Sequence, residues 1–212
     1  MSSLRQPFFD SEEYRHIDAR LPEVLKALPQ APEGHISPQQ AEFLYAFIRM
    51  TKPTFIAETG LCVGHSAMVM LLAQQSVGID PCVMSVDSCQ YSETRTAASW
   101  IGAHYEHFVF IEGDSKSVLQ EAVNTYLRRR ENLTLGFGMI DGGHDELTVA
   151  HDLRILFSFL VHGGFLWLDD FEKLLPNSGV NIAGHDFSRK WGSCHRFRGS
   201  GNRGIMLYQK GF

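Results

Sequence analysis

Five apolar runs, each followed by a stretch with helical spacing, alternate along most of this 212-residue chain. The runs cover residues 54–58, 82–86, 108–111, 133–140 and 164–168. Strands that alternate with helices form parallel sheets, and such sheets need helices on both faces. The pattern therefore predicts an α/β fold with a doubly wound, mostly parallel sheet.

The alternation stops after the fifth run. Residues 171–191 form a polar segment with weak periodicity, and two β-like runs follow at residues 194–197 and 204–208. The glycine-rich residues 198–203 between them predict a hairpin loop. We therefore expect the parallel sheet to end in a C-terminal antiparallel hairpin.

Residues 1–36 precede the alternating region and are expected to form an N-terminal helical extension, with a helix near residues 10–28 that Pro22 interrupts. Ser37 then predicts a helix start, because Pro38 follows it and Gln40 completes a capping box. Residues 37–212 would form the main domain.

Composition excludes several function classes. The net charge of −5 gives no reason to expect nucleic-acid or membrane binding. No apolar run approaches the ~20 residues of a membrane span, and residues 1–7 lack the apolar core of a signal peptide. The four cysteines show no Cys-x-x-Cys spacing, so we expect free thiols and a cytoplasmic location.

The first strand–turn–helix unit predicts a nucleotide-type site. Its turn has the spacing Gly60-x-x-x-Gly64, with Glu58 at the strand end and Ser66 near the helix start. Glycines let the backbone approach a ligand, and the helix N-terminus offers unpaired N–H groups. The spacing matches neither the dinucleotide fingerprint nor a P-loop.

Every strand of the alternating region ends in a carboxylate. These residues are Glu58, Asp87, Asp114, Asp141, Asp169 and Asp170. Open α/β sheets bind ligands at this edge, although such residues also serve as helix caps. Asp87 is placed to accept ribose hydroxyls of a nicotinamide or an S-adenosyl ligand. Glu58 would repel pyrophosphate and attract an ammonium or sulfonium group, which favours the S-adenosyl ligand.

Several segments resemble class I S-adenosylmethionine-dependent methyltransferases. The resemblance is closest to small-molecule O-methyltransferases, including the catechol O-methyltransferase-like group. The matching segments are residues 37–40, 58–66, 113–115, 139–144 and 166–170, together with Asp87. They span roughly residues 35–210 and imply a Rossmann-like methyltransferase fold, S-adenosylmethionine as cofactor and a small-molecule hydroxyl acceptor.

The resemblance also implies cofactor-binding residues. They are Glu58, Gly60, Gly64, Ser66, Asp87, Ser88, Asp114, Ser115 and Asp141. In this interpretation Glu58 faces the methionine half of the cofactor, and Ser66 reaches its carboxylate.

Catechol-type members hold a divalent cation at positions that match Asp141, Asp169 and Asp170, so the resemblance implies Mg²⁺ or another divalent cation there. Asp170 stands where catechol-specific members carry Asn, which makes this site more anionic. His144 matches the position of their base, so His144 and Asp141 are the expected catalytic residues. Alternatively, Asp141 orients the methionine end of the cofactor, Asp169 and Asp170 cap a loop, and His144 caps or supports the helix that starts near Asp145.

Other functions remain open at this stage. Residues 177–203 are rich in Arg, Lys and His, and either recognise the acceptor or form a solvated loop and hairpin. A nicotinamide-dependent oxidoreductase and a non-catalytic S-adenosylmethionine-binding module are the competing hypotheses. A homodimer is a further expectation.

Overall fold

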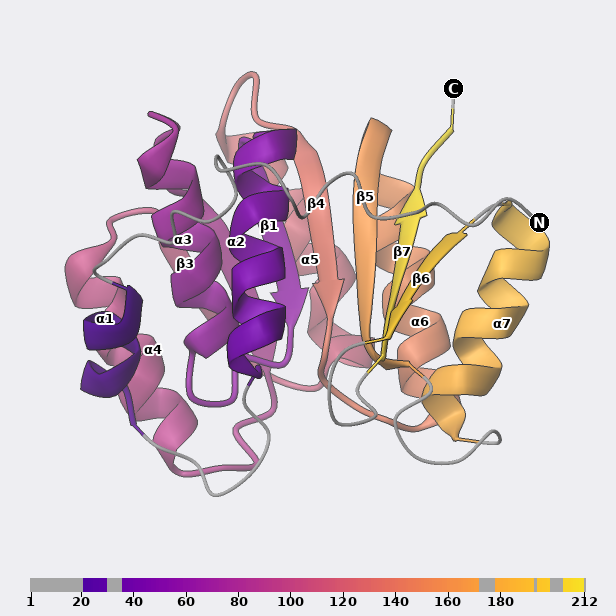
Figure 1. Cartoon of the computed structure of the whole chain (residues 1–212), viewed down its shortest axis with the longest axis horizontal. Helices are drawn as coiled ribbons and strands as arrows, with labels where there is room; N and C mark the ends of the chain where they lie inside the picture. Colours follow the sequence, from indigo (N-terminus) through magenta and orange to yellow (C-terminus); the bar gives the residue numbers. More distant parts are fainter. Residues whose placement is uncertain (1–20, 30–35, 172–177, 193, 199–203, 212) are drawn as a thin grey trace.

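The protein forms one seven-stranded mixed sheet in the order β3-β2-β1-β4-β5-β7-β6 (Figure 1). The structure is a computed structural model that describes residues 21–29, 36–171, 178–192, 194–198 and 204–211. Strands β1 to β5 pair in parallel, β7 is antiparallel to β5, and β6 is antiparallel to β7. The predicted fold class, including the C-terminal hairpin, is confirmed.

The strands lie close to the predicted apolar runs. They are β1 (Phe55–Thr59), β2 (Val83–Asp87), β3 (Phe108–Glu112), β4 (Leu135–Ile140), β5 (Leu160–Phe171), β6 (Cys194–Arg198) and β7 (Gly204–Gln209). The helices are α1 (Leu21–Ala27), α2 (Pro38–Thr51), α3 (His65–Ser76), α4 (Glu93–His104), α5 (Ser115–Arg129), α6 (Glu146–Phe159) and α7 (Gly179–Trp191). The largest boundary difference is in β5, which begins directly after α6 and runs past the predicted end.

Helix α7 lies within a segment whose weak periodicity did not predict a helix. Ser178 caps it by accepting a hydrogen bond from Asn181 N at 3.3 Å. Its buried face includes Asn181 and Gly184 beside Val180 and Phe187. Because a polar residue and a glycine occupy buried positions, the apolar stripe that reveals an amphipathic helix is broken in the sequence.

Helices cover both faces of the sheet, as the alternation predicts. Figure 1 shows α2 in front of the sheet and α5 and α6 behind it. One buried apolar cluster contains Leu44 of α2, Met68 of α3 and Ile101 of α4. The other contains residues of the helices behind the sheet, namely Leu119 of α5, Leu153 of α6 and Phe187 of α7. Among the described helices, none is long and apolar enough to cross a membrane.

The N-terminal part is described only from residue 21. The predicted helix near residues 10–28 therefore falls partly outside the described residues, and α1 accounts for the remainder. Leu28, just after α1, is buried in the same apolar cluster as α2 and α3. A division between an extension and a main domain at residue 36 stays a prediction. The predicted capping box of Ser37 and Gln40 is confirmed.

The order in which the chain adds strands to the sheet reverses at the junction of β1 and β4. From β1 it proceeds through β2 to β3 on one side, and from β4 to β5 on the other. Ligands of open α/β sheets bind beyond the carboxyl ends of the strands at such a switch point. The fold thus brings the turns after all five parallel strands to one edge.

Candidate active site

A cleft of about 520 Å³ opens at this edge of the sheet. Nine of the residues that the sequence predicted as site residues line it: Gly60, Asp87, Ser88, Asp114, Ser115, Asp141, His144, Asp169 and Asp170. The described lining also includes Tyr91, Lys116 and Thr148, which sequence reasoning missed. Glu58, Gly64 and Ser66 are not part of it.

Gly60 brings the first turn against the turn after β4. Its backbone has φ +91°, and a Cβ atom there would lie 2.2 Å from the carbonyl oxygen of Asp141. Gly60 N also donates to Val86 O at 2.9 Å, and Asp141 N donates to Thr59 O at 2.9 Å. Only glycine therefore fits this position, where the turn after β1 lies against the turn after β4. Gly64, by contrast, packs toward Ile101 of α4.

Glu58 lies on the opposite face of β1 from Thr59, which lines the cleft, because side chains alternate along a strand. It is 1% exposed and accepts hydrogen bonds from Ser85 Oγ at 2.5 Å and from Ser66 Oγ at 2.7 Å. Burial raises the pKa of Glu58 from 4.5 to about 7, against the lowering effect of the two serines. The structure thus brings Glu58 and Ser66 together below the cleft, and their contact with a cofactor stays a prediction.

Asp87 presents its carboxylate to the cleft at the end of β2. Its Oδ2 accepts a hydrogen bond from Cys62 N at 3.0 Å, and its Oδ1 accepts one from Cys89 N at 2.7 Å. Both cysteines have left-handed backbone conformations, with φ of 49° and 56°. A carboxylate has about four acceptor positions, so each oxygen can still accept a hydrogen bond from a vicinal diol. The two backbone N–H groups thus hold the carboxylate in place and leave it able to accept further hydrogen bonds.

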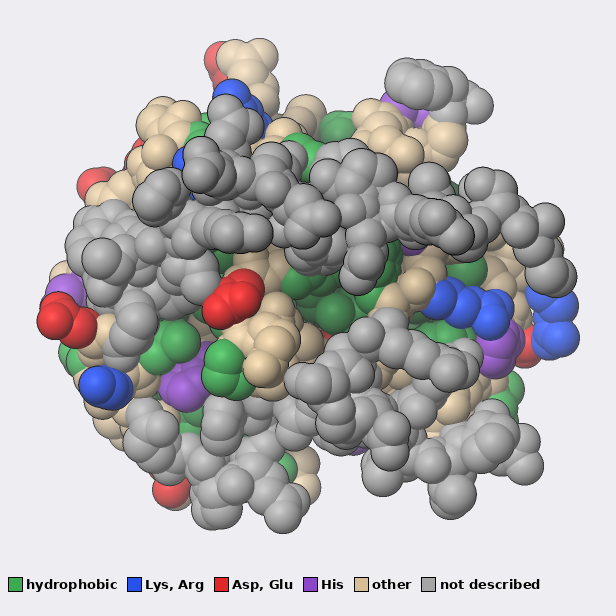
Figure 2. All heavy atoms as spheres, viewed as in Figure 1, with side chains coloured by type: hydrophobic (Ala, Val, Ile, Leu, Met, Phe, Trp, Pro, Cys, Tyr) green, Lys and Arg blue, Asp and Glu red, His purple; other side chains and the backbone are tan. Residues whose placement is uncertain are grey.

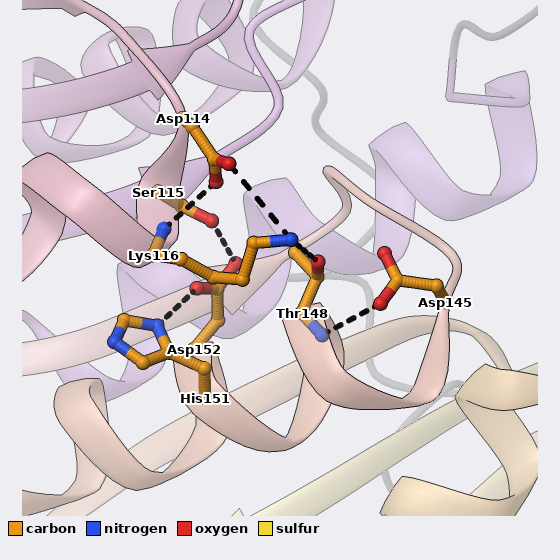
Figure 3. A network of polar contacts seen from close by, with 7 residues as sticks. All are labelled: Asp114, Ser115, Lys116, Asp145, Thr148, His151 and Asp152. Atoms are coloured by element: carbon orange, nitrogen blue, oxygen red, sulfur yellow. Dashed lines mark hydrogen bonds and ion pairs between the residues drawn. The ribbon is translucent and has the colours of Figure 1, made fainter.

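Asp114 and Ser115 begin α5 on the wall next to Asp87. Asp114 caps the helix by accepting a hydrogen bond from Lys116 N at 3.0 Å. Lys116 extends its side chain across to α6, where Nζ donates to Thr148 Oγ1 at 2.9 Å (Figure 3). The capping alternative is therefore correct for Asp114, which also faces the cleft.

Asp141, His144 and Asp170 form the group best suited to hold a cation. One ligand atom from each lies within 4.8 Å of the others. His144 Nε2 is 3.4 Å from Asp170 Oδ2, and the His144 side chain is 58% exposed. Asp170 has a left-handed backbone with φ 54°, at a point where the pairing of β5 with β7 shifts its register. The grouping differs from the predicted one, because His144 takes the place of Asp169.

Asp169 is held by other parts of the protein. Its Oδ1 accepts a hydrogen bond from Gln40 Nε2 at 2.8 Å and one from Trp167 Nε1 at 3.3 Å. Gln40 belongs to the first turn of α2 and is 2% exposed. Helix α2 is thereby linked to the end of β5 that lines the cleft.

The cleft is strongly acidic. Five aspartates line it, whereas Lys116 is the one Lys or Arg among its described lining residues. Figure 2 shows other basic side chains gathered over α7 and β6, at the right of the view; Arg189, Lys190 and Arg196 belong to these elements. None of these three lines the cleft, so a role in acceptor recognition gains no support from the described residues.

Comparison with known families matches residues 57–171 to a family described as a methyltransferase domain. The match covers just over half of the 212 residues and includes every strand-end carboxylate. The chain therefore belongs to this methyltransferase family, and the prediction of the enzyme class is confirmed. No curated protein matches the sequence.

Solved structures agree with this assignment. An O-methyltransferase from Bacillus cereus in complex with SAH has a TM-score of 0.70 at 18% identity, and 92% of each chain is covered. The O-methyltransferase TomG from Streptomyces achromogenes, in complex with SAM, has a TM-score of 0.67 at 15% identity, with 92% of this chain and 87% of TomG covered. An SAH-bound methyltransferase from Podospora anserina has a TM-score of 0.67 at 16% identity, with 92% and 89% covered. At these identities the similarity establishes the fold.

Proposed function

We propose that the protein transfers a methyl group from S-adenosylmethionine to a hydroxyl group of a small molecule. The observation that carries the proposal is the Asp87 carboxylate, held by two backbone N–H groups in the cleft of a methyltransferase domain. O-methyltransferases with the same fold, crystallised with SAM or SAH, support the choice of cofactor and of oxygen as the acceptor atom.

In this function the protein mainly positions the cofactor and the methyl acceptor. Asp87 would hold the ribose hydroxyls, and Gly60 would let the methionine half lie against the backbone. The methyl group of the cofactor is already activated, so binding two reactants in line accounts for much of the rate. The acceptor hydroxyl must also lose a proton during the reaction.

We further propose that Asp141, His144 and Asp170 bind a divalent cation near the acceptor. Two carboxylates and an imidazole suit Mn²⁺, Fe²⁺ or Zn²⁺ better than Mg²⁺, which prefers oxygen ligands. A bound cation would lower the pKa of the acceptor hydroxyl. As a ligand His144 would not serve as the general base, which is the competing hypothesis for this residue.

The cofactor assignment is tested by calorimetry with S-adenosylhomocysteine. Asp87→Ala should weaken binding about 100-fold, since hydrogen bonds to a carboxylate contribute ~1.5–3 kcal/mol each. Glu112→Gln is the matched control, because Glu112 pairs with Asp87 in the sheet register but bonds to Arg95 outside the cleft. Equal affinity of Asp87→Ala and the unmutated protein would remove Asp87 from the site.

The cation assignment is tested by titrating Mn²⁺ and following its electron paramagnetic resonance signal. His144→Ala and Asp170→Asn should each weaken Mn²⁺ binding by at least about 10-fold, because each removes one ligand. S-adenosylhomocysteine affinity should change little. If His144→Ala binds Mn²⁺ as well as the unmutated protein does, His144 is not a ligand and the base hypothesis gains.

The competing functions are tested by other assays. Family membership argues against a nicotinamide-dependent oxidoreductase, and NADH fluorescence on mixing tests that function directly. Cofactor binding without turnover across a broad acceptor panel would indicate a non-catalytic module.

All four cysteines are free thiols, which supports a cytoplasmic protein. The proposed homodimer is open to sedimentation measurements.

A further inference from the structure

Two side-chain hydrogen bonds join α5 to α6 behind the cleft wall (Figure 3). Ser115 Oγ donates to Asp152 Oδ2 at 2.9 Å, and Lys116 Nζ donates to Thr148 Oγ1 at 2.9 Å. Thr148 and Asp152 are about one helical turn apart. Consecutive residues at the start of α5 are therefore held by successive turns of α6. We call these two hydrogen bonds the α5–α6 bridge.

Asp152 is the unusual member of the bridge. It is 0% exposed, and burial raises the pKa of its carboxyl group. Its other oxygen, Oδ1, lies 3.1 Å from His151 Nδ1. Apolar residues of similar size often give equal or greater stability than a buried charged group. Stability alone therefore does not explain the carboxylate. Its hydrogen bond to Ser115, which lines the cleft, connects it to the site instead.

The two helix starts that the bridge joins are both capped. Asp114 caps α5 and lies 3.8 Å from Lys116 Nζ through Oδ2. Asp145 caps α6 by accepting a hydrogen bond from Thr148 N at 3.0 Å. Both residues that α5 contributes, and Thr148 of α6, therefore lie in capped first turns. The turn that precedes α6 carries Asp141 and His144, so the bridge links the cofactor wall to the acceptor end of the cleft.

We propose that Asp152 is a positioning residue for the cofactor, which acts through Ser115 by fixing the start of α5 against α6. Asp152 itself does not line the cleft, so it can act on a ligand only through neighbouring residues that do. Ser115 is hydrogen-bonded to it at 2.9 Å, and Thr59, which also lines the cleft, lies near enough to lower its pKa. The Lys116–Thr148 hydrogen bond serves the same end one turn earlier on α6. This inference rests on the proposed function, in which the cleft binds S-adenosylmethionine.

The test is a double-mutant cycle on S-adenosylhomocysteine binding, measured by calorimetry well below the unfolding temperature. Ser115→Ala and Asp152→Ala should each weaken binding about 5-fold, the effect of losing one ordinary hydrogen bond. The double variant should bind no more weakly than the weaker single variant, because both changes break the same contact. Asp152→Asn keeps an acceptor for Ser115 Oγ and should restore most of the affinity.

A matched control lies at the other end of α5. Thr125 Oγ1 donates to Glu121 Oε1 at 2.8 Å on the exposed side of that helix. Thr125→Val removes a side-chain hydrogen bond from the same helix as Ser115→Ala does, but far from the cleft. It should leave the affinity unchanged.

Two results would overturn the proposal. Additive losses in the cycle would mean that Ser115 and Asp152 act independently, and normal binding by Asp152→Ala would mean that Ser115 contacts the cofactor by itself. If Asp152→Ala does not fold, Asp152→Leu takes its place in the cycle, because leucine has a similar size but cannot accept the hydrogen bond of Ser115. Failure of the unmutated protein to bind S-adenosylhomocysteine would instead refute the proposed function.

Discussion

Replacing Glu58 with Gln should stabilise the protein at neutral and alkaline pH. Glu58 is buried between Ser66 and Ser85, and burial raises its pKa from 4.5 to about 7. Glutamine has nearly the same shape and can accept a hydrogen bond from one serine while it donates to the other. It therefore resembles the protonated glutamic acid that the folded protein prefers.

The direction of the change in stability with pH follows from proton binding by Glu58 in the folded and in the unfolded chain. Below pH 4.5 the carboxyl group is protonated whether the chain is folded or unfolded. Above that value the unfolded chain loses its proton first, so the contribution of Glu58 to stability falls until the folded protein also ionises near pH 7. The shift from 4.5 to about 7 corresponds to about 3 kcal/mol at full ionisation.

The assay is urea denaturation of both proteins at several values between pH 5 and pH 8. The stability difference should be small near pH 5 and should grow to about 3 kcal/mol in favour of Glu58→Gln at pH 8. Glu112→Gln is the control, because Arg95 lowers the pKa of Glu112 and no gain is expected in this window. Parallel stability profiles for Glu58→Gln and the unmutated protein would refute the argument that Glu58 is destabilised by burial.

Three further substitutions test the packing. Gly60→Ala and Gly78→Ala both place alanine at positive φ, which costs about 1 kcal/mol, but only the Cβ at residue 60 would meet the carbonyl oxygen of Asp141. Thermal unfolding should show a clearly larger loss for Gly60→Ala, which should also lose S-adenosylhomocysteine binding; equal losses would contradict the close approach. Lys210→Met removes two hydrogen bonds from Nζ to the carbonyl oxygens of Phe157 and Leu160. It should lower stability by about 1–2 kcal/mol in the same assay, and an unchanged unfolding temperature would show that this contact contributes nothing.

The sequence predicts the parallel sheet well because each of its strands, and each helix that connects two of them, has a recognisable local sequence pattern. Apolar runs mark the strands, and the capping box at Ser37 marks the start of α2. Helix α7 lacks such a signal, because Asn181 and Gly184 lie on its buried face.

The strand-end carboxylates predicted correctly which edge of the sheet carries the cleft. They did not predict which of these side chains line it. Asp87 and Asp141 line the cleft as expected, whereas the alternation along β1 directs Glu58 to the other face. At the end of β5 the left-handed backbone of Asp170 brings its carboxylate near His144. Local strand patterns do not reveal a turn of this kind.

Contacts between distant parts of the chain are the least predictable. The hydrogen bond between Gln40 and Asp169 spans 129 positions, and nothing in the sequence near either residue indicates it. The contact between Ser115 and Asp152 has the same character. Such pairs depend on the completed packing of helices against the sheet.

The amide of Gln40 has one oxygen and one nitrogen, and α2 and the cleft each use one of them. The oxygen accepts a hydrogen bond from Ser37 N at the start of α2, while the nitrogen donates to Asp169. Fraying of the first turn of α2 would therefore also remove one of the hydrogen bonds that hold the aspartate, although that turn lies outside the sheet. We therefore expect order at the beginning of this helix to be coupled to order around Asp169, and amide exchange at Ser37 would report on both.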